Sequence, residues 1–248
     1  MANFLPLKSY IIFCITRLAK QHGLSDPFLD AGCGIGDVSR YLASCGWQGV
    51  AVDSSPIAFE QAAENLKDFN AVRIEKKSLL DVSGAFRTVF LLDALEHFED
   101  DTSVLKKIAS LLVAGGHAVI TVPSNPREWR WDDEMYGHYR RYTPDDIKTK
   151  LQDAGLEPLE LWDFTFPVFW LLRRLYTALL SPQVSHDKSK SELTAASSAV
   201  SAWHIPFVSD FIAHGAFIWT AITKLQFALF RNCLRCGHEM IVLARKKI

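Results

Sequence analysis

The segment from residue 28 to residue 36, FLDAGCGIG, constrains the fold of this chain more than any other. Its first two residues predict a short buried strand, and Asp30 lies at the carboxyl end of that strand. The loop that follows alternates glycine with other residues, at Gly32, Gly34 and Gly36. Glycines let the backbone turn sharply and let a ligand approach where a Cβ atom would block it. A helical pattern begins at Val38, and its free N–H groups face the loop. These features together predict a nucleotide-type site at the edge of an α/β sheet.

The spacing of the glycines separates two kinds of nucleotide site. A dinucleotide fingerprint reads G-x-G-x-x-G, whereas this loop reads G-x-G-x-G with an acid two residues before the first glycine. The pattern D-x-G-x-G-x-G resembles the first motif of the class I S-adenosylmethionine-dependent methyltransferases. The resemblance implies S-adenosylmethionine as cofactor, and it assigns the amino-acid part of this donor to Asp30, Gly32, Cys33, Gly34 and Gly36.

The rest of the donor site is expected after the second and third strands. Residues 49–53 (GVAVD) predict a strand that ends in Asp53, a carboxylate at the usual distance for both ribose hydroxyls, followed by Ser54 and a helix. A plain helix-capping role for Asp53 is the alternative. Residues 71–75 predict the third strand. The family often has a G-D pair after it for adenine, but Lys77 and Ser78 stand there. Ser78, Leu80 or Asp81 could take that role, and Asp81 could also be a turn residue.

The fourth predicted strand, residues 88–92, is followed by Asp93-Ala94-Leu95-Glu96-His97. This run resembles the fourth motif of the small-molecule branch of the family, which implies that Asp93 and Ala94 lie beside the donor. The alternative for Glu96 and His97 is helix capping and packing. An amphipathic helix over 101–112, ended by Gly115-Gly116, and a fifth strand at 117–122 complete the pattern. Strands alternating with helices predict a doubly wound parallel sheet, with ligands at the carboxyl ends of its strands.

The connection over residues 123–142 is long and aromatic, which indicates a functional loop. It ends in G-H-Y-R-R-Y, directly before a helix that Thr143 caps and that runs to Ala154. The run G-H-x-R-R-Y-T is similar to one in a methyltransferase branch (type 11/12-like) of ubiquinone-biosynthesis and polysaccharide-cluster enzymes. We expect this segment to stand over the methyl donor. His138 is the first candidate for a general base, His97 the second, and Tyr136 is a further candidate. Two arginines, Arg140 and Arg141, either hold an anionic acceptor group or fasten the loop to nearby carboxylates and carbonyls.

Two more strands are expected, over 155–162 and 238–245, and the family pairs them with the seventh strand antiparallel. The expected fold is thus a Rossmann-like seven-stranded sheet with a helical insert between strands six and seven. We divide the chain into an N-terminal helix (1–24), a methyltransferase core (25–162), the insert (163–237) and a final core strand (238–248).

The insert is unusually apolar. It contains a helix candidate at 164–180 with Arg173 and Arg174 in its middle, a Ser-, Lys- and Ala-rich linker at 181–201, and a long apolar stretch at 207–230. Charged residues make either helix a poor membrane span. Three interpretations stay open: a lid around a greasy acceptor, a membrane-surface contact, and a helical hairpin or dimer contact without a substrate role.

Composition adds little beyond this. The net charge of -1 gives no indication of nucleic-acid binding, and five cysteines with no secretory leader favour a reducing cytosol. Residues 4–19 predict an amphipathic helix, with a signal anchor as the minor alternative. The run Cys233-x-x-Cys236-x-His238 lacks the further ligands of a zinc site, so no metal is predicted. We therefore expect a cytoplasmic protein, with peripheral contact at the inner membrane face and a homodimer as open possibilities.

The function expected from these patterns is methyl transfer from S-adenosylmethionine to a small hydrophobic or lipid-linked acceptor, such as an isoprenoid, a quinone or a glycolipid. O- or C-methylation is favoured. The alternatives are an NAD-linked oxidoreductase on the same fold and a non-catalytic module that binds a partner through the insert.

Overall fold

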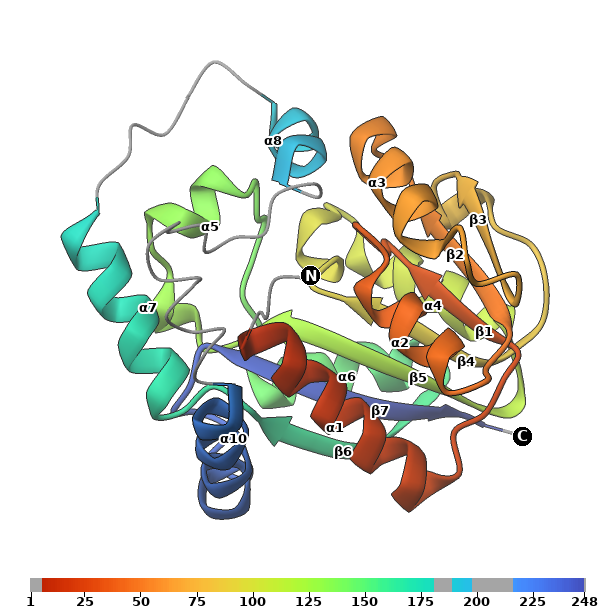
Figure 1. The fold of residues 1–248 in the computed structure, drawn as a ribbon. Coiled ribbons are helices and arrows are strands. Elements are labelled where there is room, and N and C mark those ends of the chain that lie inside the picture. The colour runs from red at the N-terminus through yellow and green to blue at the C-terminus, as the bar shows by residue number, and fades with distance from the viewer. Residues whose placement is uncertain (1–5, 181–188, 198–215, 248) are drawn as a thin grey trace.

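The computed structural model describes residues 6–180, 189–197 and 216–247. At its centre is a seven-stranded sheet in the order β3-β2-β1-β4-β5-β7-β6, in which β7 runs antiparallel to both of its neighbours (Figure 1). This arrangement confirms the expected Rossmann-like sheet. The strands are β1 Phe28–Ala31, β2 Gly49–Asp53, β3 Val72–Lys76, β4 Phe86–Leu92, β5 Leu112–Pro123, β6 Leu156–Asp163 and β7 Glu239–Lys246.

Helices cover both faces of the sheet. The longer ones are α1 Pro6–His22, α2 Asp37–Ser44, α3 Pro56–Leu66, α4 Asp101–Leu111, α6 Pro144–Asp153, α7 Val168–Leu179, α8 Lys190–Ser197 and α10 Ala216–Phe230. Short turns of helix are η1 Leu79–Asp81, η2 Leu95–His97, η3 Pro126–Glu128 and α5 Trp131–Met135. Side chains of α4 and α6 belong to one hydrophobic core, and those of α1, α2, α7 and α10 belong to the other.

Alternating side chains along the central strands belong to these two hydrophobic cores. In β4, Val89 and Leu91 pack with α4, while Phe90 and Leu92 pack on the opposite face. Successive side chains of a strand point to opposite faces of the sheet, and each fully buried aliphatic or aromatic side chain stabilises the fold by roughly 1.5–3 kcal/mol. A strand that is apolar at every position is therefore what a sheet covered on both faces requires.

The N-terminal helix matches its prediction. Five residues on one side of α1 are buried against the sheet: Tyr10, Ile11, Cys14, Ile15 and Leu18. Within the described ranges of the chain, no helix is both long and apolar enough to cross a bilayer.

One boundary prediction was wrong. Gly115 and Gly116 do not end helix α4, which stops at Leu111, but lie inside β5. The register between β4 and β5 is irregular there, because Phe86 pairs with Leu112 whereas Thr88 pairs with His117. Gly115 has a φ of 72°, and a Cβ on Gly116 would lie 3.1 Å from the carbonyl oxygen of Arg87. The glycines thus accommodate a bulge in the strand.

The apolar insert differs in detail from its prediction. Its first helix, α7, begins only at Val168, after a buried Phe164. The expected linker at 181–201 contains helix α8, and its remaining residues, apart from Ser189, lie outside the described residues. The apolar stretch 207–230 is described from Ala216 onward, where α10 begins.

Both ends of the insert are joined to each other at the edge of the sheet. The carboxylate of Asp163, at the end of β6, accepts hydrogen bonds from the backbone N–H groups of Thr165 (2.8 Å) and Gly237 (2.7 Å). The hydroxyl of Thr165 accepts another from the N–H of His238 (2.9 Å), just before β7. We call this group of residues the insert neck.

Candidate active site

A buried carboxylate in β1 contacts α2, the helix that follows the glycine loop. Asp30 is 2% exposed and accepts a hydrogen bond from the Ser39 hydroxyl (2.6 Å) in the first turns of α2. Burial raises the pKa of Asp30 to about 6. Gly32 has a φ of 72°, and a Cβ there would lie 3.2 Å from the Cβ of Ala94. The loop after β1 and the motif after β4 are therefore in close contact, as a shared donor site requires.

Asp53 supports the same loop from the end of β2. One carboxylate oxygen accepts the backbone N–H of Gly34 (2.9 Å), and the other accepts that of Ser55 (2.8 Å). The N-cap of α3 is Ser55, whereas the neighbouring Ser54 is exposed. Since each carboxylate oxygen has two lone pairs, these bonds are compatible with a further bond to a ribose hydroxyl. The ribose role of Asp53 stays a prediction.

The residues expected near adenine lie after β3. Ser78 caps η1 by accepting the backbone N–H of Leu80 (3.3 Å). The side chain of Leu80 is about half exposed, and Asp81 is exposed as well. An exposed apolar side chain next to polar ones suits the face and edge of a purine, but the geometry does not select one of the three, and the adenine contact remains a prediction.

The motif after β4 begins with a backbone in an unusual conformation. Asp93 has a φ of 50°, in the left-handed region. Its N–H donates to the Thr121 hydroxyl of β5 (2.8 Å), and that hydroxyl donates to the Asp93 carboxylate (2.6 Å). Reciprocal bonds of this kind hold the carboxylate at the carboxyl end of the sheet, where the donor motif places it.

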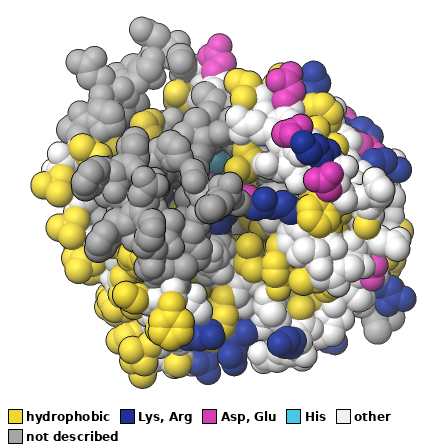
Figure 2. All heavy atoms as spheres, in the orientation of Figure 1, with side chains coloured by type: hydrophobic (Ala, Val, Ile, Leu, Met, Phe, Trp, Pro, Cys, Tyr) yellow, Lys and Arg dark blue, Asp and Glu magenta, His cyan; other side chains and the backbone are white. Residues whose placement is uncertain are grey.

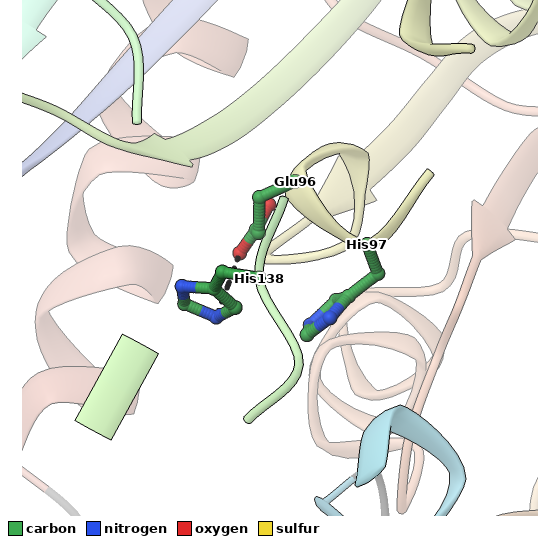
Figure 3. A group of neighbouring side chains, drawn as sticks. All are labelled: Glu96, His97 and His138. Carbon is green, nitrogen blue, oxygen red and sulfur yellow. Dashed lines mark ion pairs between the residues drawn. The ribbon is translucent and has the colours of Figure 1, made fainter. Parts of the chain in front are cut away.

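The segment that follows α5 packs directly on this motif. The backbone N–H of Tyr139 donates to the carbonyl oxygen of Glu96 (2.9 Å). The rings of His97 and His138 are edge to face, with centroids 4.9 Å apart, and the Tyr136 ring is 6.0 Å from that of His138. The three candidate catalytic residues, His138, His97 and Tyr136, are thus neighbours, and Figure 3 shows the first two of them. Their assignment to catalysis stays a prediction.

His138 is oriented by a buried carboxylate that sequence reasoning missed. Its Nδ1 atom lies 2.9 Å from Asp133, which is 1% exposed. Asp133 also accepts hydrogen bonds from Arg141 (2.8 Å) and from Arg173 of α7 (2.9 Å). Although burial alone would raise it, these partners hold the pKa of Asp133 well below its ordinary value. The only sequence indication was the Asp132-Asp133 pair inside an aromatic segment.

Arg173 joins the insert to this segment. It is 4% exposed and donates to both oxygens of Asp132 (2.8 and 2.6 Å) and to the carbonyl oxygen of Glu128 (2.9 Å). Charge-assisted bidentate contacts of this kind are geometrically specific. An arginine in the middle of an apolar helix is therefore explained by a buried acidic partner about 40 residues earlier in the chain.

The two arginines of the G-H-Y-R-R-Y run hold this segment against neighbouring carboxylates and backbone carbonyl groups. Arg140 donates to the carbonyl oxygen of Glu99 (2.5 Å) and pairs with Asp101 (3.1 Å). Arg141 is 7% exposed, and besides Asp133 it donates to the carbonyl oxygens of Ser124 (2.9 Å) and His238 (3.0 Å). The structure favours the fastening role over a role in holding an anionic acceptor.

The cysteines near the end of the insert form a disulfide between Cys233 and Cys236. In this state they offer no thiolate to a metal ion. His238 is buried at the start of β7.

Comparison with known proteins decides the family. Residues 8–161 match the family described as methyltransferase domain. The chain belongs to this methyltransferase family. Two relatives are named ubiquinone biosynthesis O-methyltransferase. The protein from Ruegeria pomeroyi is 28% identical, and the match covers 60% of this chain and 69% of that protein. The protein from Xanthomonas euvesicatoria pv. vesicatoria is 36% identical, and the match covers 52% of this chain and 62% of that protein. Among eight such relatives the match covers 62–70% of their lengths, and for six of them less than two thirds.

The fold is also that of solved methyltransferases. Magnesium protoporphyrin IX methyltransferase from Synechocystis PCC 6803, solved with bound S-adenosylhomocysteine, superposes with a TM-score of 0.58, covering 98% of this chain and 84% of that one at 15% identity. This methyltransferase is therefore a class I enzyme whose methyl donor is S-adenosylmethionine. The interpretations as an NAD-linked oxidoreductase and as a non-catalytic module are set aside. The insert after Asp163 lies outside the matched family region.

Proposed function

We propose that this methyltransferase methylates a hydroxyl oxygen of a small, hydrophobic acceptor of the phenol or quinone type. The observation that carries the proposal is the His97–His138 pair, which stands beside the donor motif and is backed by the buried carboxylate of Asp133. The names of the relatives, ubiquinone biosynthesis O-methyltransferase, support the same class of acceptor.

The main task of the protein in this reaction is to position the acceptor oxygen against the methyl group of the donor. The acceptor oxygen attacks the methyl carbon in line with the carbon–sulfur bond, an oxygen–carbon bond forms, and the sulfur leaves as neutral S-adenosylhomocysteine. Holding the two reactants in a near-attack geometry can contribute about 7–11 kcal/mol in well-oriented systems. On the donor side we assign the amino-acid part to Asp30 and the glycine loop, the ribose to Asp53 and the methyl side to Asp93.

Deprotonation of the acceptor is assigned to His138. Its Nδ1 atom contacts Asp133, so a carboxylate stabilises the imidazolium that forms when the other ring nitrogen takes the hydroxyl proton. His97 plays a different part. Burial, with the neighbouring His138, lowers its pKa to about 3, so it is neutral at physiological pH and can hydrogen-bond the acceptor without adding charge.

The insert supplies the apolar side of the proposed acceptor site and a contact with lipid. Leu171, Leu175 and Leu179 follow one side of α7 at four-residue spacing and are about half exposed or more. Exposed apolar side chains of α10 include Phe217, Ile218, Leu225 and Leu229. Figure 2 shows hydrophobic side chains gathered along the side where these two helices lie. A surface of this kind suits peripheral binding to a membrane that carries a lipid-linked acceptor.

The proposal is tested by assaying methyl transfer from labelled S-adenosylmethionine to a panel of catechols, prenylated hydroquinones, amines and carbon acids. The expected product is an O-methyl ether of a phenolic acceptor. His138→Gln should lower kcat by about 10²–10⁴, the usual contribution of a general base, with donor affinity unchanged, while His117→Gln, far along β5, leaves kcat unaltered. Methylation of nitrogen or carbon alone would refute the proposed acceptor class.

A further inference from the structure

Three side chains at the proposed acceptor site lie close enough together to bind one ion. Glu96, His97 and His138 each offer a ligand atom, and these three atoms all lie within 4.8 Å of one another. Figure 3 shows Glu96 and His97 coming from η2 and His138 from the separate segment after α5, with the Glu96 carboxylate directed toward His138. Side chains at this spacing, although they come from two segments of the chain, can bind one ion together.

Glu96 is buried without a hydrogen-bond partner for one of its oxygens. The residue is 2% exposed, and within the described part of the chain its Oε2 atom has no donor. Its Oε1 atom is 3.9 Å from Nε2 of His138, which is too long for a hydrogen bond. A buried carboxylate oxygen without a donor is unfavourable, and a cation bound at this position would remove that cost.

Both imidazoles are held in the way that metal-binding histidines are held. Nδ1 of His138 contacts the Asp133 carboxylate (2.9 Å), and Nδ1 of His97 contacts the Thr194 hydroxyl of α8 (3.1 Å). Metal-bound histidines almost always use their second nitrogen for an outer carboxylate, carbonyl or similar partner. For His138 this arrangement directs Nε2 toward Glu96.

We propose that Glu96, His97 and His138 bind one divalent transition-metal ion. Two imidazoles and one carboxylate are a donor set for zinc, cobalt, iron or manganese, whereas calcium and magnesium prefer sites built from oxygen alone. Three protein ligands leave at least one coordination position for water or for an oxygen of the acceptor.

The role of the ion, unlike its binding, rests on the proposed O-methylation. A hydroxyl of the acceptor bound at the open position becomes more acidic, because the ion lowers the pKa of an oxygen that it binds, as zinc does for a bound water. The proton passes to solvent, and the metal-bound oxyanion attacks the methyl carbon while the carbon–sulfur bond breaks. With the ion bound, His138 is a ligand and no longer the base, so the general-base role assigned to it above applies only to the metal-free protein.

The test begins with protein freed of metal by a chelator and titrated with Zn²⁺ and with Co²⁺ by calorimetry. One ion per chain is expected. Glu96→Gln, His97→Ala and His138→Ala should each weaken its affinity at least tenfold. His117→Ala and the double variant Cys233→Ser/Cys236→Ser control for surface histidines and for the cysteine pair, and neither should change the affinity. Absence of binding, or loss of binding only in the cysteine variant, overturns the proposal.

A second measurement does not depend on the folding of variants. X-ray absorption at the zinc edge of the loaded wild-type protein should show a first shell of nitrogen and oxygen with scattering from two imidazoles. A sulfur shell, or one without imidazole, overturns the site. The two proposals fail separately: a metal-loaded protein that methylates no phenol refutes the proposed function alone, and full O-methylation by the metal-free protein refutes the role of the ion.

Discussion

At the scale of single residues, Asp53 supports the glycine loop and is the proposed contact for the ribose. Its carboxylate fixes the N–H groups of Gly34 and Ser55 and still has lone pairs for a ribose. We expect Asp53→Ala to weaken S-adenosylhomocysteine binding by a factor of ten or more, roughly 1.4 kcal/mol per factor of ten, because the proposed ribose contact and the support of the loop are both lost. Calorimetry measures this. Asp68→Ala, an exposed acid beyond α3, is the control, and equal affinities in both variants would remove Asp53 from the donor site.

Asp101, the first residue of α4, permits a prediction about pH. Burial opposes its ionisation, but hydrogen bonds from Lys150 and Tyr142 (both 2.9 Å) outweigh burial and lower its pKa. An acid with a depressed folded-state pKa stabilises the fold above its unfolded pKa, near 3.8, and that contribution is lost as pH falls through the folded value.

We therefore expect Asp101→Asn to reduce the free energy of unfolding at pH 7 by about 1–3 kcal/mol, with a smaller difference from wild type near pH 3. Urea unfolding across this pH range checks the prediction. The exposed Asp146→Asn should leave stability within about 0.5 kcal/mol of wild type. A loss in Asp101→Asn that is constant with pH would show that the charge of this carboxylate is not what stabilises the fold.

At the scale of elements, the contact between α7 and the segment after β5 depends on one buried arginine. Replacing Arg173 by Met leaves Asp132 without a guanidinium partner, whereas Asp133 keeps Arg141. Removing one partner from a buried ion pair typically costs about 3–5 kcal/mol. Chemical denaturation should show this loss. The matched control is Arg174→Met, whose partially exposed side chain pairs with Glu128, and for which we expect about 1 kcal/mol or less. Similar losses in the two variants would contradict the argument.

The sheet and the donor loop could be predicted because their information is local. The strand, acid and glycine spacing around Asp30 and the acid ending the strand at Asp53 each lie within a few consecutive residues. The contacts of Arg173 with Asp132 join residues 41 positions apart, and no periodic pattern marks such a pair. Gly115 and Gly116 were misplaced for a related reason, since a glycine pair fits a helix end and a strand bulge equally well until the pairing of β4 with β5 is known.

At the scale of the whole molecule, the exposed leucines of α7 predict binding to lipid. Changing both Leu175 and Leu179 to Asp should weaken binding to phosphatidylglycerol–phosphatidylcholine vesicles by tenfold or more, because each buried leucine contributes roughly 1.5–3 kcal/mol. Co-sedimentation measures this, and donor affinity should not change. Ile57→Asp, on the distant α3, is the control. If wild-type protein ignores vesicles but dimerises through these leucines, the surface is a protein contact instead.

The insert neck has a consequence for how this enzyme can change. Because β6 ends and β7 begins at the same edge of the sheet, and Asp163 and Thr165 bind Gly237 and His238 there, the chain leaves and re-enters the core at one point. Lengthening a loop whose ends are already joined costs little, about 0.6 kcal/mol for each doubling. The segment between the neck residues can therefore be enlarged at little entropic cost, provided that Arg173 and the buried Phe169 and Phe227 keep their contacts with the rest of the enzyme.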